Sequence, residues 1–262
     1  MFEKHFNRKY EMGEFPYFVP KDELEYNLDY AKSIIENKSV ARHWKELIEL
    51  GGIAKTGENI TEARKIISHG GLILEICAGP AGGYMPAVLL FDYNANIMIN
   101  DLCPTVVREW QNLFKGMNNP PPYVEYATFS VCDIPFKNNC IDVVSGYDAL
   151  INIEGNFEDF NKALMEIHRV LKPGGLFVFN HIYVSKKYYE QMPLPARDVI
   201  KVKYPFAFWD SLNIFDELGY SNIEEIPGET ISNEDDDGDI AILCRSLNTY
   251  LEYSQFVRYC VK

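Results

Sequence analysis

The sequence predicts a doubly wound α/β fold, in which helices cover both faces of a mostly parallel sheet. Short apolar runs bounded by turn residues recur along the middle of the chain, as is typical of buried parallel strands. Amphipathic helical segments alternate with these runs over roughly 110 residues, which favours right-handed βαβ crossovers. A glycine-rich turn, residues 78–83, directly follows the first run.

The first 70 residues are expected to form a helical extension that caps the substrate side of the main domain. Two apolar stripes have the spacing of a helix face, with members Leu24, Leu28, Ala31 and Ile35 in one and Val40, Trp44 and Leu47 in the other. A third helix is predicted from Thr61, a good N-cap, to Gly70. The segment is also rich in aromatic residues, at Tyr10, Phe15, Tyr17, Phe18, Tyr26 and Tyr30. These suit either a ligand pocket or a small core.

Five strands are expected in the main domain. They are residues 72–76, 97–99, 124–131, 141–144 and 176–179. A helix begins near Pro104, because proline is favoured in the first turn of a helix. The clearest helix covers residues 156–171, where Asn156 serves as the cap and Pro173 stops the helix.

The C-terminal part is expected to close the sheet with an antiparallel pair of strands. After a helix around 209–218, residues 223–226 and 240–244 are read as two strands joined by an acidic loop. Residues 247–262 fit either a strand or a helix. The predicted parts of the chain are an N-terminal cap (1–70), a main domain (71–246) with a substrate-side insert (182–208), and a C-terminal extension (247–262).

Composition limits the classes of protein. Acidic residues outnumber basic ones 38 to 25, for a net charge of −13, which disfavours a nucleic-acid partner. No apolar stretch is long enough to span a membrane, and the first residues lack the pattern of a secretory signal, so a cytoplasmic location is expected. The six cysteines form no C-x-x-C pair and have no histidine at zinc spacing, so no metal site is expected.

The glycine-rich turn lies where a ligand can approach the backbone closely, and on its own it also fits a dinucleotide. Charge separates the two possibilities. Glu75, at the end of the preceding strand, would oppose a pyrophosphate but suits the sulfonium and ammonium groups of S-adenosylmethionine. Pro80 also lacks the N–H that a phosphate cradle would use. The structural alternative for Glu75 is a capping or ion-pairing role.

Two further aspartates follow predicted strands. Asp101 ends the second strand, 22 residues beyond Gly79, where a carboxylate can accept hydrogen bonds from both ribose hydroxyls of a nucleoside. Asp101 could also cap the helix near Pro104, and the two roles are compatible. Asp133 follows the third strand and could accept a hydrogen bond from an adenine amino group, or serve as a turn residue before Pro135.

These segments, in this order, resemble the class I S-adenosylmethionine-dependent methyltransferases. The matching stretches are LEICAGPAGG, INDLCP, CDIPFKNNCIDVVSGYDAL and EIHRVLKPGGLFVFN, of which LKPGG is the most specific. The resemblance covers residues 70–182 well and extends loosely to 246. It implies a seven-stranded Rossmann-like sheet with an antiparallel last strand, S-adenosylmethionine as the cofactor and S-adenosylhomocysteine as the product.

Carried over residue by residue, the resemblance implies that the cofactor is bound by Glu75, Ala78, Gly79, Asp101, Leu102, Asp133, Ile134 and Tyr147. Glu75 and Gly79 would contact the methionine end, and Asp101 the ribose. Asp133 with Ile134 would contact the adenine. Two positions depart from the family pattern, since Cys77 and Ala81 stand where members have glycine. Cys77 must therefore adopt a negative φ or accept strain.

Methyl transfer from a sulfonium is a direct displacement, which an enzyme promotes mainly by alignment of the reacting groups. A general base helps with a hydroxyl or protonated amine acceptor. His181 is a candidate because it directly follows the fifth strand, and Tyr147 and Asp148 are others. The insert 182–208 is rich in aromatic residues, which could line a pocket for a small-molecule acceptor or form the core of a small cap.

Other functions remain open at this stage. A nicotinamide-dependent oxidoreductase would use the same turn, although Glu75 opposes its pyrophosphate. A nucleoside-binding protein without methyl transfer would be consistent with Cys77 and Ala81. A methyltransferase of nucleic acid or protein is also open, with the negative charge against the former.

Overall fold

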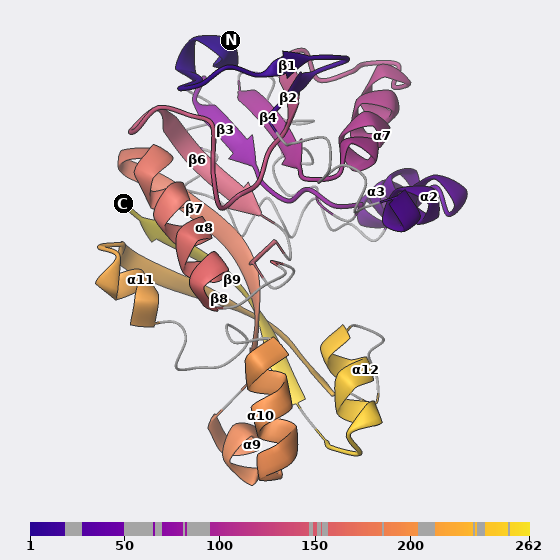
Figure 1. The fold of residues 1–262 in the computed structure, drawn as a ribbon, viewed down its shortest axis with the longest axis vertical. Coiled ribbons are helices and arrows are strands. Elements are labelled where there is room, and N and C mark those ends of the chain that lie inside the picture. Colours follow the sequence, from indigo (N-terminus) through magenta and orange to yellow (C-terminus); the bar gives the residue numbers. More distant parts are fainter. Residues whose placement is uncertain are drawn as a thin grey trace.

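A computed structural model of the chain has a nine-stranded sheet at its centre (Figure 1). The residues that it describes are 1–18, 28–49, 65, 70–80, 82, 95–146, 149, 150, 153, 157–184, 186–203, 213–232, 234, 239–250 and 252–262.

The strands lie in the order β1-β2-β5-β4-β3-β6-β7-β9-β8. Their bounds are β1 Glu11–Met12, β2 Pro16–Tyr17, β3 Leu72–Glu75, β4 Asn96–Asp101, β5 Val124–Thr128, β6 Ile141–Gly146, β7 Leu171–Val184, β8 Ser221–Ser232 and β9 Glu252–Val261. Strands β5, β4, β3, β6 and β7 are parallel, whereas β9 runs antiparallel between β7 and β8. The seven strands from β5 to β8 confirm the predicted mostly parallel sheet with an antiparallel last strand.

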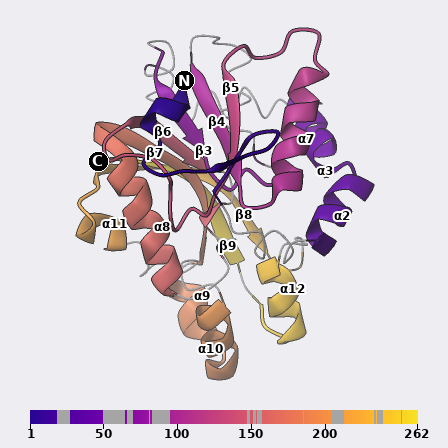
Figure 2. The ribbon, with the colours of Figure 1, turned by 45° about the horizontal axis from the view of Figure 1, so that its top comes forward.

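Helices cover both faces of this sheet. Their bounds are η1 Phe2–His5, α2 Leu28–Glu36, α3 Ser39–Glu49, α7 Pro104–Lys115, α8 Phe157–Val170, α9 Lys186–Gln191, α10 Leu194–Lys203, α11 Asn213–Glu217 and α12 Asp239–Ser246. In Figure 2, α2 and α3 lie beside α7, and α8 lies on the other side of the strands. No helix of the described residues is long and apolar enough to span a membrane.

Side-chain alternation along the strands places described core residues on both faces of the sheet. Met98 packs in the larger cluster, with residues of α8 such as Phe160 and Leu164. The next residue, Ile99, packs in a second cluster with Val106 of α7 and Trp44 of α3. Because neighbouring residues of a strand face opposite sides of the sheet, α8 and the group α2, α3 and α7 cover opposite faces.

The N-terminal segment is only partly helical. The helices predicted around Leu28 and Trp44 are confirmed as α2 and α3, whereas the third, 61–70, lies outside the described residues apart from 65 and 70. The prediction of helix is wrong for residues 11–17, which form β1 and β2. There the N–H of Phe18 donates to Thr128 O at 2.9 Å. This segment therefore pairs with the edge strand β5 and forms hydrogen bonds with its backbone instead of forming a helix.

The predicted strand at 240–244 is wrong, because these residues form α12. Ala241 and Cys244 are buried and Ile242 between them is exposed, which is the spacing of a helix face. A short apolar run cannot be assigned to strand or helix by its pattern alone. The closing strand is β9, which lies within the stretch 247–262 that was expected as a C-terminal extension.

The long strands β7, β8 and β9 carry a small helical group at one end of the molecule, consisting of α9, α10 and α12 (Figure 1). Helix α9 follows the C-terminal end of β7, which is parallel to β6 and β3. This group, which we name the cap helices, therefore lies beyond the edge of the sheet at which the parallel strands end. Ligands of doubly wound folds bind at that edge.

Candidate functional site

Two buried carboxylates mark the C-terminal edge of the sheet. Glu75 ends β3 and is fully buried, and Asp101 ends β4 with 9% of its surface exposed. Glu75 pairs in register with Ile99, so Asp101, two residues further along β4, points to the same face. The structure thus brings together the two residues that the sequence assigned to the methionine and ribose ends of the ligand.

The glycine loop after β3 is tied to both neighbouring elements. Ala78 N–H donates to Asn100 O at 2.8 Å, and Gly79 N–H donates to Asp101 Oδ2 at 2.8 Å. On the other side of the same residue, Trp110 Nε1 donates to Gly79 O at 2.8 Å. The loop is therefore held against β4 and α7 at successive peptide groups.

Cys77 stands at a position that favours glycine. Its φ is +46°, in the left-handed region, so the strained alternative of the sequence prediction is the one observed. The half-buried thiol faces Asp101, and burial together with the charges of Asp101 and Glu75 raises the pKa of Cys77. The thiol is therefore neutral at physiological pH and unsuited to act as a nucleophile.

Backbone donors favour the ionised form of Asp101. Cys103 N–H donates to Oδ1 at 2.8 Å, while Gly79 N–H occupies one position on Oδ2. Burial raises the pKa of Asp101, and the N–H groups of Cys103, Gly79 and Leu102 oppose that shift. Each carboxylate oxygen can accept a further hydrogen bond, so Asp101 can bind two vicinal hydroxyl groups of a ligand.

The bond to Cys103 N–H also ties Asp101 to the residue before α7, as the structural alternative predicted. Leu102, directly after Asp101, has 36% of its surface exposed and can cover part of a ligand bound there.

Two buried hydroxyls lie beside the carboxylates and were not singled out from the sequence. Ser145 of β6 is in register with Glu75, and Thr128 of β5 is in register with Asp101. Within the described part of the chain, neither hydroxyl oxygen has a hydrogen-bond partner. Only the strand register places these side chains beside the carboxylates.

Among the aromatic residues of the N-terminal segment, Tyr30 of α2 lies near Asp101. Although 43% of its surface is exposed, burial of the remainder and the charge of Asp101 raise the pKa of its hydroxyl. One turn along α2, Ile34 packs in the cluster that contains Ala78 and Cys103. Helix α2 therefore presents a tyrosine to the entrance of the site.

The predicted adenine residues are placed differently. The Asp133 side chain is 67% exposed and pairs with Arg8, which also donates to Asp133 O at 2.8 Å. Ile134 is fully buried in the larger core, and its N–H donates to Glu166 Oε2 at 2.8 Å. Their predicted contacts with adenine remain predictions.

The candidate catalytic residues lie near or beyond the ends of β6 and β7. His181 lies on β7 and pairs with Phe256 of β9. The structure describes the backbone of His181 but not its side chain. Tyr147 and Asp148 lie outside the described residues, directly after β6. Among the described residues, no three side chains of the metal-binding types come together.

Gly82 closes the loop by donating its N–H to Ala78 O at 2.7 Å. A Cβ at this position would lie 1.9 Å from that carbonyl oxygen. We expect Gly82→Ala to lower the free energy of unfolding by about 1–3 kcal/mol or more, because the backbone must move. Thermal denaturation measures the effect. Gly116→Ala is the control, since φ is −79° and the nearest atom would be 3.3 Å away, and equal losses in both variants would contradict the expectation.

Arg169 of α8 fixes the segment that carries Asp133 and Ile134. Its guanidinium donates to Ile134 O and Phe136 O, both at 2.7 Å, and pairs with Glu166. Arg169→Met should lower the free energy of unfolding by about 1–3 kcal/mol, because buried acceptors lose a charged donor.

Urea denaturation compares this variant with Lys162→Met on the same helix. Lys162 pairs with Glu158 at 3.4 Å, but its side chain is 52% exposed, so the loss should stay within about 0.5 kcal/mol. Similar losses at Lys162 and Arg169 would show that the Arg169 contacts do not hold the segment.

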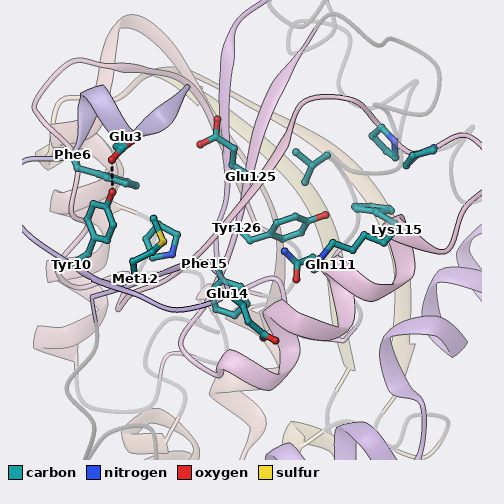
Figure 3. Close-up of a pocket in the computed structure, with 15 residues that line it drawn as sticks. Glu3, Phe6, Tyr10, Met12, Glu14, Phe15, Gln111, Lys115, Glu125 and Tyr126 are labelled. Atoms are coloured by element: carbon teal, nitrogen blue, oxygen red, sulfur yellow. Dashed lines mark hydrogen bonds between the residues drawn. The ribbon is translucent and has the colours of Figure 1, made fainter.

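A pocket of about 600 Å³ lies elsewhere, between β5, the C-terminal half of α7 and the segment that contains β1 and β2 (Figure 3). Two of its carboxylates are already engaged: the Tyr10 hydroxyl donates to Glu3 at 2.5 Å, and Arg108 Nε donates to Glu14 at 2.7 Å. None of the predicted cofactor residues lines this pocket. This pocket is therefore separate from the edge of the sheet that carries Glu75 and Asp101.

Comparisons with known proteins identify the domain that carries these residues. Residues 74–179, from β3 to β7, match the model of a methyltransferase domain family. No curated protein sequence matches the chain.

Several solved structures share the fold at low sequence identity. An arsenic(III) S-adenosylmethionine methyltransferase from Chlamydomonas reinhardtii has a TM-score of 0.55 at 14% identity, over 73% of this chain and 64% of that chain. The YcgJ protein from Bacillus subtilis has a TM-score of 0.54 at 13% identity, over 74% and 92%. Phosphoethanolamine N-methyltransferase 2 from Haemonchus contortus, in complex with S-adenosyl-L-methionine, has a TM-score of 0.52 at 18% identity, over 74% and 49%.

This chain therefore spans about half the length of the Haemonchus enzyme. The matched domain, the strand order and the two carboxylates agree with the resemblance seen in the sequence. Residues 74–179 therefore match a methyltransferase domain, and the fold around them is shared with solved S-adenosylmethionine-dependent methyltransferases.

Proposed function

We propose that the protein binds S-adenosylmethionine at the C-terminal edge of the sheet and transfers its methyl group to a small-molecule acceptor. The observation that carries this proposal is the pair of buried carboxylates, Glu75 and Asp101, on one face beside the glycine loop. Asp101 suits the ribose hydroxyls. Glu75 suits a cationic ligand and opposes a pyrophosphate, which argues against a nicotinamide dinucleotide.

We assign the cofactor contacts to Glu75, Ala78, Gly79, Asp101, Leu102, Asp133, Ile134 and Tyr147. The loop after β3 supports the assignment to the methionine end, because Gly79 has φ +47° and a backbone that a ligand can approach. Exposure of Leu102 supports a contact with the ribose or base. Asp133 is accessible to an adenine amino group, provided that the base competes with Arg8 or shares the carboxylate with it.

When bound, S-adenosylmethionine supplies a methyl group on a cationic sulfur, which a nucleophile can displace directly. The contribution of the protein is to hold the two reactants in line and to exclude water. His181, near the end of β7, is proposed as the general base for an acceptor that must lose a proton, with Tyr147 as the second candidate.

The acceptor is proposed to bind between the cofactor site and the cap helices, because these helices follow the end of β7. The proposed division of the chain assigns the same role to the N-terminal cap, in which Tyr30 lies near enough to Asp101 for that charge to raise its pKa. Two structural neighbours act, by their names, on arsenic(III) and on phosphoethanolamine, which supports a small acceptor. The net charge of −13 disfavours a nucleic acid.

A second candidate is a nucleoside-binding protein of the same fold without methyl transfer. The specific observation in its favour is Cys77, which places a side chain and a strained backbone in the cofactor loop. Incubation with methyl-labelled S-adenosylmethionine and a panel of small amines, thiols, hydroxyl compounds and arsenite separates the two functions. Labelled product supports methyl transfer, and binding of the cofactor without turnover of any member favours the second candidate.

A further inference from the structure

Two tryptophans lie outside the proposed cofactor contacts, in the core between α3 and α7. Trp44 and Trp110 pack edge to face, with ring centroids 5.7 Å apart and an interplanar angle of 89°. Both are buried, and both belong to the cluster that contains Ala78 and Cys103. They differ in one respect: the Trp110 indole N–H donates to the cofactor loop, whereas the Trp44 indole N–H has no hydrogen-bond partner among the described residues.

The Trp110 contact determines how Gly79 is held. Trp110 Nε1 donates to Gly79 O at 2.8 Å, and that carbonyl belongs to the peptide bond with Pro80, which has no N–H. The N–H of Gly79 donates to Asp101 Oδ2 at 2.8 Å. Gly79 is thus held on its carbonyl side by an indole and on its amide side by the carboxylate assigned to the ribose. The residue needs this restraint, because glycine has more conformational freedom than any other residue.

The Trp44 indole provides the internal comparison. Among the described residues, Trp44 Nε1 is buried without a hydrogen-bond partner. Its ring packs on Trp110 and, at 5.5 Å between centroids, on Phe114. Its contribution therefore comes from packing between α3 and α7.

We propose that Trp110 is a positioning residue for the cofactor, acting through its indole N–H on Gly79 and through Gly79 on Asp101. The inference rests on the proposed function, because it assigns to Trp110 the preorganisation of a loop that binds S-adenosylmethionine. A preorganised loop binds more tightly, since less freedom is lost when the ligand arrives.

The test compares Trp110→Phe with Trp44→Phe in the full chain. Each variant replaces an indole by a phenyl ring in the same cluster, but only the first removes a donor to the loop. The affinity for S-adenosylhomocysteine is measured by titration calorimetry. We expect Trp110→Phe to raise Kd by about fivefold to tenfold and Trp44→Phe to change it less than about twofold.

A second readout distinguishes positioning from general loss of packing. The Gly79 N–H is one of the donors that oppose the upward shift of the Asp101 pKa, so a looser loop should raise that pKa further. The pH at which affinity for S-adenosylhomocysteine is half lost should therefore move upward in Trp110→Phe. It should stay in place in Trp44→Phe, even if both variants have a lower melting temperature.

Three results would overturn the inference. Unchanged Kd in Trp110→Phe, or equal weakening in both variants, would assign Trp110 to packing alone. If Trp110→Phe does not fold, hydrogen exchange of the indole N–H groups in the wild-type chain decides. Binding of S-adenosylhomocysteine should slow exchange at Trp110 more than at Trp44, and equal effects would contradict the inference. A wild-type protein that does not bind S-adenosylhomocysteine would instead refute the proposed function itself.

Discussion

Replacement of Glu75 by glutamine is expected to weaken the binding of S-adenosylmethionine by about 10- to 100-fold, the range expected when a hydrogen bond to a charged group is lost. Glu75 is fully buried at the end of β3, where its carboxylate faces the proposed methionine end of the ligand. Glutamine keeps the shape and removes the charge. Titration calorimetry with S-adenosylmethionine and S-adenosylhomocysteine measures the loss for both ligands.

Stability should respond in the opposite direction. Burial of a carboxylate is costly, so the ligand-free Glu75→Gln protein should be at least as stable as the wild type in thermal denaturation. Glu109→Gln, on α7 and outside the site, is the control and should bind both ligands normally. Tight NADH binding by Glu75→Gln would favour an oxidoreductase, and unchanged affinity for S-adenosylmethionine would remove Glu75 from the cofactor site.

The second large effect is expected at Asp101. Asp101→Asn should weaken S-adenosylhomocysteine binding by about 10- to 100-fold, because the amide nitrogen cannot accept from backbone N–H groups or ribose hydroxyls. One of the donors, Gly79 N–H or Cys103 N–H, would also lose its acceptor. The variant should therefore lose stability as well, by about 1–3 kcal/mol in urea denaturation.

The same residue predicts a pH dependence. Burial raises the pKa of Asp101 above its ordinary 3.8, so the folded protein keeps a proton there at a pH where the unfolded chain has lost it. The cost of the ionised form is present above the raised pKa and is relieved as the pH falls through it. Affinity for S-adenosylhomocysteine should fall in the same window, because the ligand needs the ionised acceptor.

Apart from Glu75, three titratable groups near Asp101 do not change charge in that window. The pKa values of Tyr30, Cys77 and Cys103 are all raised, by burial first and by the charge of Asp101 in addition, so these groups stay neutral. Calorimetric titrations across the acid range should show a larger fall in affinity for the wild type than for Asp101→Asn, in which Glu75 is the one of the two carboxylates that remains. A fall of the same size in Asp101→Asn would assign the pH dependence to another group.

The sequence was sufficient for the parallel core because its strands are buried on both faces. Runs such as Leu72–Glu75 and Ile141–Gly146 have no solvent face, and turn residues mark their ends. The closing strand was misplaced for a related reason. The run 240–243 is as apolar as a strand but too short for its pattern to exclude a helix, and β9 contains polar and charged residues such as Gln255 and Arg258.

The positions of candidate site residues could be predicted where the local sequence alone fixes their place in the fold. Glu75 and Asp101 end apolar strands, so their place at the edge of the sheet follows from the local sequence. Ser145, Thr128 and Tyr30 could not be identified in this way. The hydroxyls reach the site through strand register and Tyr30 through the packing of α2 against α7, and both are tertiary properties.

The contact between Trp110 and Gly79 could not be predicted from the local sequence either. The position of Trp110 on the apolar face of α7 indicates a core residue, and it is buried as expected. Nothing in the local sequence shows that its indole N–H lies 2.8 Å from Gly79 O, because 31 positions separate the two residues.

Calorimetric titration of the wild-type chain with S-adenosylhomocysteine tests the central claim most directly, with NADH titrated in parallel. We expect saturable one-site binding of S-adenosylhomocysteine, lost or strongly weakened in Asp101→Asn, and no binding of NADH. Absence of S-adenosylhomocysteine binding by the folded wild-type protein, or tight binding of NADH instead, would contradict it.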